Sequence, residues 1–575
     1  MKRYAAAIPA LFAAVILSAQ NLNPTVEVTN VYSSSAKDIG KPVQEMAVPD
    51  SVTTFNLKLD YSVFDSPYKG AYEFTPYSTA DGPAVKDLDR QQFYLRAGIG
   101  YSLHPEFEAV WSPEFKYGVR LDAFARHQSF FGNYRGLKGV TAFDGKRDVT
   151  RMIWDKSLSF GYDALTDVGA KASWAWKKGE VTATAAYTNL SGKDYMITRS
   201  LNGARIGATV RSIGTEKVRY AASVLWRYGS DWGRFNEQTN HYHVVENRLD
   251  IKGDVAFPLS LGELYTKVDF SLESLKQGLN ETGMILSATP GYRFAKGNWF
   301  FDLGVKVDGF VGDRERFKVQ HVYPAVYVSY NIPSIDMTVY ASATGGSRLN
   351  AYGDVVAATH VFNMNHYVVA GSRLLDNSVD RVRAMLGLRG NISHRFHYHL
   401  RGGYALVGNG LLDAMVLEDP LGNPFAGPMP ATGYASFHVA FADLDCNWIS
   451  DHVKADAHFK IDGAFPLKSH GGSGTAPFFL PALLTGSVKG GYIWNKALTV
   501  GLSVDFSTSR KSPFAADHWY KIPGYADLGI FGEYQINKLI GVWLKGGNLL
   551  HSTNQAIPLY TASGIYFTAG IVLTF

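Results

Sequence analysis

The C-terminal stretch Gly564–Phe575 reads G-I-Y-F-T-A-G-I-V-L-T-F. In an extended strand successive side chains point to opposite faces. The apolar set on one face is Ile565, Phe567, Ala569, Ile571, Leu573 and Phe575. The other face carries Tyr566, Thr568, Gly570, Val572 and Thr574. Such an ending is typical of the last strand of a membrane β-barrel, although a terminal strand of a soluble β-sandwich also alternates.

The same alternation recurs along the chain, in segments longer than the roughly five or six residues of a soluble strand. In 245–257 the apolar face is Val245, Leu249, Ile251, Val255 and Phe257, and the charged face is Glu246, Arg248, Asp250, Lys252 and Asp254. About nine to eleven tilted residues are enough to cross a bilayer. The sequence therefore predicts an all-β fold, a transmembrane antiparallel up-and-down β-barrel over residues 54–575. The segments number about 22, within a range of about 18 to 24 and with an even count favoured.

The charged faces must line the lumen, because a charge facing the middle of the bilayer costs roughly 2–4 kcal/mol. The predicted interior is therefore polar. Its arginines, Arg381, Arg383, Arg389 and Arg401, fit either an anion-selective path or a ladder of ion pairs, and the mixed signs on most strands favour the ladder.

The connections between predicted strands alternate between short and long. Ser393–Arg395 is one of the short turns. Six stretches rich in Gly, Pro and aromatic residues are predicted as long loops: Ser129–Val149, Gly229–His241, Gly345–Asp380, Gly408–Thr432, Pro466–Pro481 and Ser509–Gly524. Short periplasmic turns and long outer loops are the arrangement of outer-membrane barrels.

The N-terminus has the features of an export signal. Residues 1–20 combine a charged start (Lys2 and Arg3), an apolar run and small residues before a cleavage site, and they predict a secretory signal peptide. No later run of about eighteen apolar residues predicts a membrane-spanning helix. Aromatic residues make up 14% of the chain and charged residues 19%, a composition that suits a barrel with aromatic interfaces.

The totals also exclude some partners and sites. A single cysteine, Cys446, excludes an internal disulfide framework and a cysteine-based zinc site. The net charge of +5 indicates no nucleic-acid partner. The expected surroundings of the barrel are outer-membrane lipid, and the expected location is the cell outer membrane.

Two regions resemble the TonB-dependent receptor superfamily. The last three strands, from Ala526-Asp527-Leu528-Gly529 through Leu544–Leu550 to Phe575, are similar to the end of that family's barrel. Val26, Glu27, Val28 and Thr29 resemble its coupling box, which implies partner binding by strand addition to an energy-coupling periplasmic protein. Val48–Thr53 resembles the opening of its plug domain.

The sequence departs from this family in one respect: residues 21–53 form only a short periplasmic N-terminal segment, too short for a full plug. A wide barrel needs something inside it. The candidates are this segment, long loops folding inward (Gly345–Asp380 is the longest), or a lumen-filling protein partner.

Histidines supply the candidate metal ligands. His397 and His399 share one face of a strand, a spacing that can chelate a metal, and His241, His243 and Glu246 form a similar set at a loop–strand junction. The alternative, polar lumen or loop residues without metal, is favoured for both sets, so no metal site and no cofactor are predicted.

An enzyme is not predicted. His127, Ser129 and Asn133 are residue types used by outer-membrane hydrolases, but their spacing defines no triad. The leading functional hypothesis is a TonB-dependent-receptor-like barrel that binds or transports a solute at the cell surface. The alternatives are a non-transporting scaffold whose lumen or loops hold a lipoprotein or periplasmic partner and, more distantly, a soluble secreted β-protein.

Overall fold

The fold is described from a computed structural model of the chain. The described residues are 92–101, 103–113, 115, 118–193, 197–213, 218–235, 241–277, 279–312, 321–359, 377–416, 429–467, 479–494, 497–512, 518–555 and 564–575. The predicted signal peptide (1–20), the N-terminal segment (21–53) and residues 54–91 of the predicted barrel lie outside them, so these boundaries stay predictions. Among the described residues, no helix is long and apolar enough to cross a membrane.

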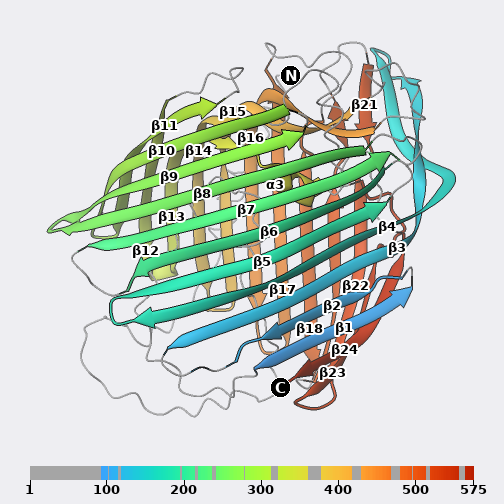
Figure 1. The fold of residues 1–575 in the computed structure, drawn as a ribbon, viewed down its shortest axis with the longest axis horizontal. Coiled ribbons are helices and arrows are strands. Elements are labelled where there is room, and N and C mark those ends of the chain that lie inside the picture. Colours follow the sequence, from blue (N-terminus) through green and yellow to red (C-terminus); the bar gives the residue numbers. More distant parts are fainter. Residues whose placement is uncertain are drawn as a thin grey trace, which may run out of the picture. The chain divides into compact units, whose positions relative to one another are not determined.

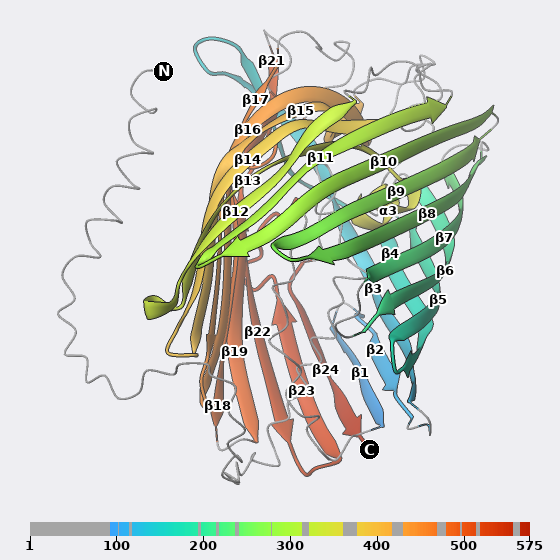
Figure 2. The same ribbon diagram turned by 90° about the vertical axis from the view of Figure 1, so that its left-hand side faces the viewer.

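Twenty-two antiparallel strands form a closed barrel (Figures 1 and 2). Its first half runs in chain order through β1 (Phe93–Tyr101), β2 (Glu106–Trp111), β3 (Val119–Phe143), β4 (Asp148–Trp176), β5 (Gly179–Lys193), β6 (Ile197–Ser212), β7 (Arg219–Phe235), β8 (His241–Leu259), β9 (Gly262–Gln277), β10 (Leu279–Lys296) and β11 (Trp299–Gly312). The second half comprises β12 (Val322–Ile332), β13 (Met337–Leu349), β14 (Asn377–Ile392), β15 (Phe396–Val416), β16 (Met429–Ile449), β17 (Val453–Pro466), β18 (Leu484–Trp494), β19 (Leu498–Ser507), β22 (Tyr525–Gln535), β23 (Ile540–Gly547) and β24 (Tyr566–Thr574).

Four short elements lie in the connections. They are the 3-10 turn η1 (Pro333–Ile335), the helix α3 (Tyr352–Thr359), and the strands β20 (Arg510–Ser512) and β21 (His518–Ile522). The pair β20–β21 belongs to the connection between β19 and β22, and β21 runs parallel to the first residues of β4.

The barrel closes between its first and last strands. β1 pairs with β24 from Tyr94 opposite Thr574 to Tyr101 opposite Phe567. The Phe575 carbonyl accepts hydrogen bonds from the amides of Gln92 and Phe93. The predicted all-β barrel of about 22 strands is therefore confirmed, and the C-terminal stretch is its closing strand.

The two faces of that strand are those predicted. Phe567 and Ile571 are 38% and 45% exposed on the outside, while Thr568 and Val572 are almost fully buried. The same holds for β8, where Ile251 points outward and the charged residues point into the barrel. An apolar outer face over a closed sheet is the surface that a bilayer covers, so the localisation to the outer membrane follows from the fold.

Several inward-facing charges are paired, either across neighbouring strands or along one strand. Arg401 of β15 lies 3.2 Å from Asp443 of β16, and Lys460 lies 2.7 Å from Asp462 on the same strand, β17. Arg383 likewise pairs with Asp380 of its own strand at 3.2 Å.

The connections agree only in part with the predicted pattern, because β7 continues to Phe235 and β15 to Val416, past the predicted loop starts at Gly229 and Gly408. Residues 393–395 form the short turn between β14 and β15, with Ser393 and His394 in the left-handed region. The predicted loop Ser129–Val149 is wrong, because β3 and β4 continue through it as a long hairpin. A register shift between Arg135 and Leu137 interrupts the alternation there, which is why the pattern resembled a loop.

The strands of the barrel wall differ greatly in length. β1, β2, β23 and β24, which flank the closure, have between 6 and 9 residues each, whereas β3 and β4 have 25 and 29. The first residues of β4 and the β20–β21 pair form a small sheet above this low part. Met152, Phe479 and Ile522 are fully buried against one face of the sheet.

Candidate functional site

The connection between β13 and β14 folds into the lumen. After β13 ends at Leu349, the chain forms α3, whose residues contact inward-facing side chains of β5 to β9. In both ribbon views α3 lies within the outline of the barrel (Figures 1 and 2). One of the long loops that were expected to fold inward, Gly345–Asp380, therefore contributes at least residues 350–359 to closing the lumen.

The contact has an apolar centre. Tyr352, Val355 and Val356 lie three and four positions apart, on one face of the helix, and all three are buried. They pack against inward-facing apolar residues of the wall, namely Leu190, Leu201, Val244 and Leu275. An eight-residue helix is marginal by itself, so this packing is what stabilises α3. These wall residues form an apolar patch on an otherwise polar inner wall, and α3 packs on that patch.

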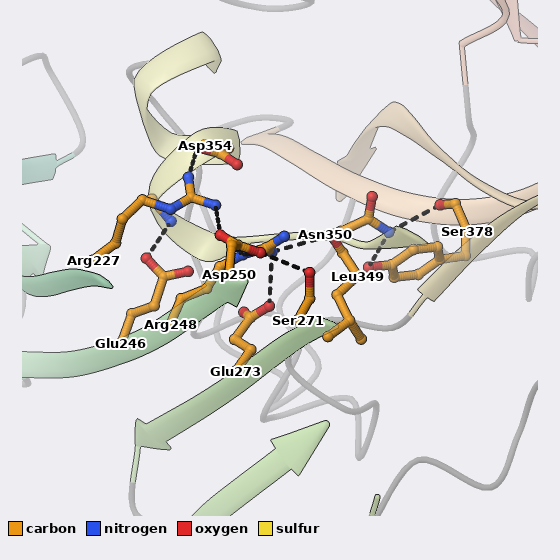
Figure 3. A network of polar contacts seen from close by, with 12 residues as sticks. Arg227, Glu246, Arg248, Asp250, Ser271, Glu273, Leu349, Asn350, Asp354 and Ser378 are labelled. Atoms are coloured by element: carbon orange, nitrogen blue, oxygen red, sulfur yellow. Dashed lines mark hydrogen bonds and ion pairs between the residues drawn. The ribbon is translucent and has the colours of Figure 1, made fainter. Parts of the chain in front are cut away.

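Polar contacts fix the start of the helix (Figure 3). The Gly353 amide donates to a Glu246 carboxylate oxygen at 2.9 Å, which satisfies one of the free N–H groups of the first turn. The Tyr352 hydroxyl donates to Asp231, a fully buried carboxylate that also accepts a hydrogen bond from Arg199 at 2.8 Å. A carboxylate beside a helix N-terminus is favoured by the helix dipole.

Two arginines connect this segment to the wall. Arg227 Nη1 lies 2.6 Å from Asp354 of α3, and its Nη2 lies 3.1 Å from Asp250 of β8. Arg248 donates to the Leu349 carbonyl at 3.2 Å and pairs with Glu273 at 3.3 Å (Figure 3). Arg248 and Glu273 are largely removed from water, whereas the Asp354 side chain is 56% exposed.

The far side of the segment is also held. Asn350 Nδ2 donates to Ser378 Oγ at 2.9 Å and to the Tyr434 hydroxyl at 3.4 Å. Ser378 belongs to β14 and Tyr434 to β16, on the wall beyond β13. The segment 349–356 therefore touches strands on two parts of the barrel wall and narrows the lumen between them.

The predicted set His241, His243 and Glu246 is not assembled. Glu246 is buried on the inner face and contacts α3, whereas His243 is exposed and hydrogen-bonded to Ser230 at 2.9 Å. Residues an odd number apart on a strand face opposite sides, so Glu246 cannot join the two histidines. The hydrogen-bond partner of Glu246 is instead the α3 backbone.

His397 and His399 do share the inner face, but with partners that the sequence did not reveal. The register places Asp445 opposite His399, and His458 opposite Asp445. The His458 Nδ1 is hydrogen-bonded to Asp445, and His399 Nε2 to the Tyr340 hydroxyl at 2.7 Å.

His397, His399, Asp445 and His458 line a cavity of about 510 Å³ on the inner wall of β15 to β19, where Asp456, Lys489 and Asp505 also take part. Within the described part of the chain, no group of three or more His, Cys, Asp or Glu side chains is arranged to hold a metal ion. The coupling-box residues Val26, Glu27, Val28 and Thr29 lie outside the described residues.

Sequence reasoning missed the docking site of α3. One signal was available: Val244 and Val245 are adjacent apolar residues, which breaks the alternation of β8. Val244 is the inward one and is fully buried under α3.

Comparisons with known proteins find similarity at the level of structure. No protein-family model matches the sequence, and no curated protein matches it. The FrpB iron transporter from Neisseria meningitidis is similar, with a TM-score of 0.61 and 10% identity over 85% of this chain and 82% of that one. The copper transporter OprC has a TM-score of 0.59 and 12% identity over 84% and 80% of the two chains. FpvAI in complex with pyocin S2 has a TM-score of 0.59 and 11% identity over 85% and 71%.

Identities this low establish the fold alone. The solved structures are TonB-dependent receptors, and the closed 22-strand wall is the part of them that this chain reproduces. The chain has the outer-membrane barrel fold of the TonB-dependent receptors.

Proposed function

We propose that the protein is an outer-membrane receptor that binds a solute at the cell surface and admits it through a lumen narrowed by its own β13–β14 connection. The observation that carries the proposal is the docking of α3 inside the barrel through Arg227, Asp231 and Glu246. The similar solved structures include a copper transporter and an iron transporter, which supports transport as the class of activity.

The lumen wall favours a hydrophilic solute. Apart from the patch beneath α3, inward-facing residues on the described strands include many charged and hydroxyl side chains, such as those of the cavity on β15 to β19. A polar solute exchanges its hydration for such groups more readily than an apolar one.

The test is ion conductance of the full chain in planar bilayers. In the test variant a flexible Gly-Ser linker of equal length replaces Ala351–Thr359. The matched control replaces Asp144–Arg147, the tip of the β3–β4 hairpin, in the same way. The test variant should conduct several times more current than wild type, and the control should not. Equal conductance in all three would show that α3 does not restrict the lumen.

Energised uptake is a separate part of the proposal, resting on the resemblance of Val26–Thr29 to a coupling box. Strand addition needs backbone N–H groups, so Val28→Pro should abolish binding to an energy-coupling periplasmic protein, while Val28→Thr should preserve it. Pull-down with that protein gives the readout. Equal binding by both variants would refute coupling through this segment.

A second candidate function is a scaffold whose lumen holds a partner protein. It is favoured by the cavity on β15 to β19, where His397, Asp456, Lys489 and Asp505 are exposed to the lumen among the described residues. Copurification from native membranes separates the two candidates. A stoichiometric protein protected inside the barrel supports the scaffold, and an unaccompanied barrel supports the receptor.

A further inference from the structure

The small sheet formed by β20, β21 and the first residues of β4 carries three positively charged side chains in a row. Among the described residues, no acidic side chain forms an ion pair with them. Lys511 of β20 is directly opposite Lys521 of β21, and Lys521 is directly opposite Arg151 of β4. Side chains directly opposite one another share one face of a sheet. Three cationic side chains therefore stand side by side across three adjacent strands.

Such a row destabilises the sheet, since like charges at directly opposed positions repel. Among the described residues, no acidic side chain forms an ion pair with Arg151, Lys511 or Lys521. At the tip of the β3–β4 hairpin, Asp144 accepts hydrogen bonds from the amides of Lys146 and Arg147, and these lower its pKa. A row kept at a cost to stability indicates a ligand that supplies the missing negative charge.

An aromatic ring extends the row. The Arg147 guanidinium lies 3.8 Å from the centre of the Trp519 ring, and Lys511 Nζ lies 5.6 Å from it. Trp519 shares a face with Lys521, two residues away. A guanidinium stacked on an indole keeps its N–H edge available for anionic oxygens. Arg147, Arg151, Lys511, Lys521 and Trp519 are called the basic face below.

The basic face is turned away from the buried side of the sheet. Met152 and Ile522, next in sequence to Arg151 and Lys521, point to the opposite side and are fully buried with Phe479. Arg151 and Lys511 are exposed, as is Val140, which lies opposite Arg151. The sheet is therefore anchored by one face and presents the other to solvent.

We propose that the basic face is a binding site for a soluble polyanion, such as an acidic polysaccharide, at the cell surface. The position of the basic face, far along β3 from the start of that strand, argues against lipid headgroups as its ligand. Val140 lies about 70 Å along β3 from Val119, at about 3.3 Å per residue, whereas the apolar band of such barrels is only about 25 Å tall. Spacing over three strands suits a polymer with repeated charges better than a single small anion. This inference does not depend on how α3 controls the lumen.

The test uses the full chain in nanodiscs of zwitterionic lipid and measures the Kd of fluorescent dextran sulfate, with uncharged dextran as the reference probe. The test variant is Lys511→Gln/Lys521→Gln. The matched control is Lys177→Gln/Arg395→Gln, which removes two exposed charges from turns at the opposite end of the barrel. The test variant should bind dextran sulfate at least tenfold more weakly than wild type, and the control should bind as wild type does.

Thermal unfolding of the same samples distinguishes a ligand site from a structural role. Because the substitutions relieve repulsion, the Tm of the test variant should equal or exceed that of wild type. Arg151→Gln supplies a second variant with the same expectation. Equal weakening by test and control variants overturns the proposal, as does a loss of binding together with a lowered Tm. Binding of wild type to vesicles containing anionic phospholipid but not to dextran sulfate would reassign the face to lipid and also overturn it.

Discussion

Arg227 of β7 and Asp354 of α3 are 127 residues apart in the sequence, and their side chains meet at 2.6 Å inside the barrel. The pair joins a strand of the wall to a segment that crosses the lumen. It is the most direct of the polar contacts through which the barrel holds its own constriction.

Arg227→Gln should loosen that constriction. The change removes the ion pair that links α3 to β7, while Asp250 keeps its pair with Arg248 at 3.0 Å. We expect larger and noisier single-channel currents, with the barrel still folded. The matched control is Arg293→Gln, another inward-facing arginine, which pairs with Glu263. If both variants conduct alike, the Arg227–Asp354 pair has no special role in holding α3.

Gly353→Val should displace α3 without altering any charge. A Cβ at this position would lie 2.8 Å from the Glu246 carboxylate oxygen that accepts the Gly353 amide hydrogen bond. Either the Glu246 carboxylate or the first turn of the helix must move, which breaks this hydrogen bond, so the lumen should open. The measurement is again conductance, with Gly253→Val as control because a Cβ there meets no atom within 4 Å. A current unchanged from wild type would mean that the contact with Glu246 is dispensable.

Leu502→Arg and Ser503→Arg test which face of β19 meets lipid. Leu502 is 56% exposed on the outer face, and Ser503 lines the inner cavity. An arginine toward the middle of the bilayer costs roughly 2–4 kcal/mol, while one in the lumen is tolerated. Urea titration of folding into lipid vesicles should show that loss of stability for Leu502→Arg only. The reverse order would invert the assignment of the faces.

Phe575→Ala should weaken closure of the barrel. The Phe575 ring stacks on Phe93 with centroids 5.9 Å apart, a contact worth about 0.5–1.5 kcal/mol beyond its burial. The backbone hydrogen bonds between these residues remain possible, so the variant should fold but accumulate more slowly. Heat-modifiable migration in gels follows the folded fraction over time. Phe575→Tyr, which keeps the ring, should behave like wild type.

The wall of this barrel could be predicted from the sequence because each strand carries its own signal. Glu246 lies on the inner face and Ile251 on the outer face. Side chains alternate along a strand, and a charge facing the bilayer is costly, so the residues of one strand are enough to assign its two faces. The docking of α3 could not be predicted in that way. Glu246 meets Gly353 only because β8 and the β13–β14 connection are brought together by all the strands between them.

The histidine pair illustrates the same limit. His397 and His399 were correctly assigned to one inner face, yet Asp445 and His458 reach them through the pairing of β15 with β16 and of β16 with β17. Their side-chain neighbours depend on register, and a shift of one residue would replace every one of them. The strand alternation alone does not determine register between neighbours.

The short strands beside the closure have a consequence for the surrounding lipid. β2 has 6 residues and β23 has 8, fewer than the roughly nine to eleven that a tilted strand needs to cross a bilayer of ordinary thickness. Hydrophobic mismatch on this side must be relieved by local thinning of the membrane. The bilayer is therefore expected to be thinnest beside β2 and β23, on either side of the closing pair β1–β24, whose strands have 9 residues each.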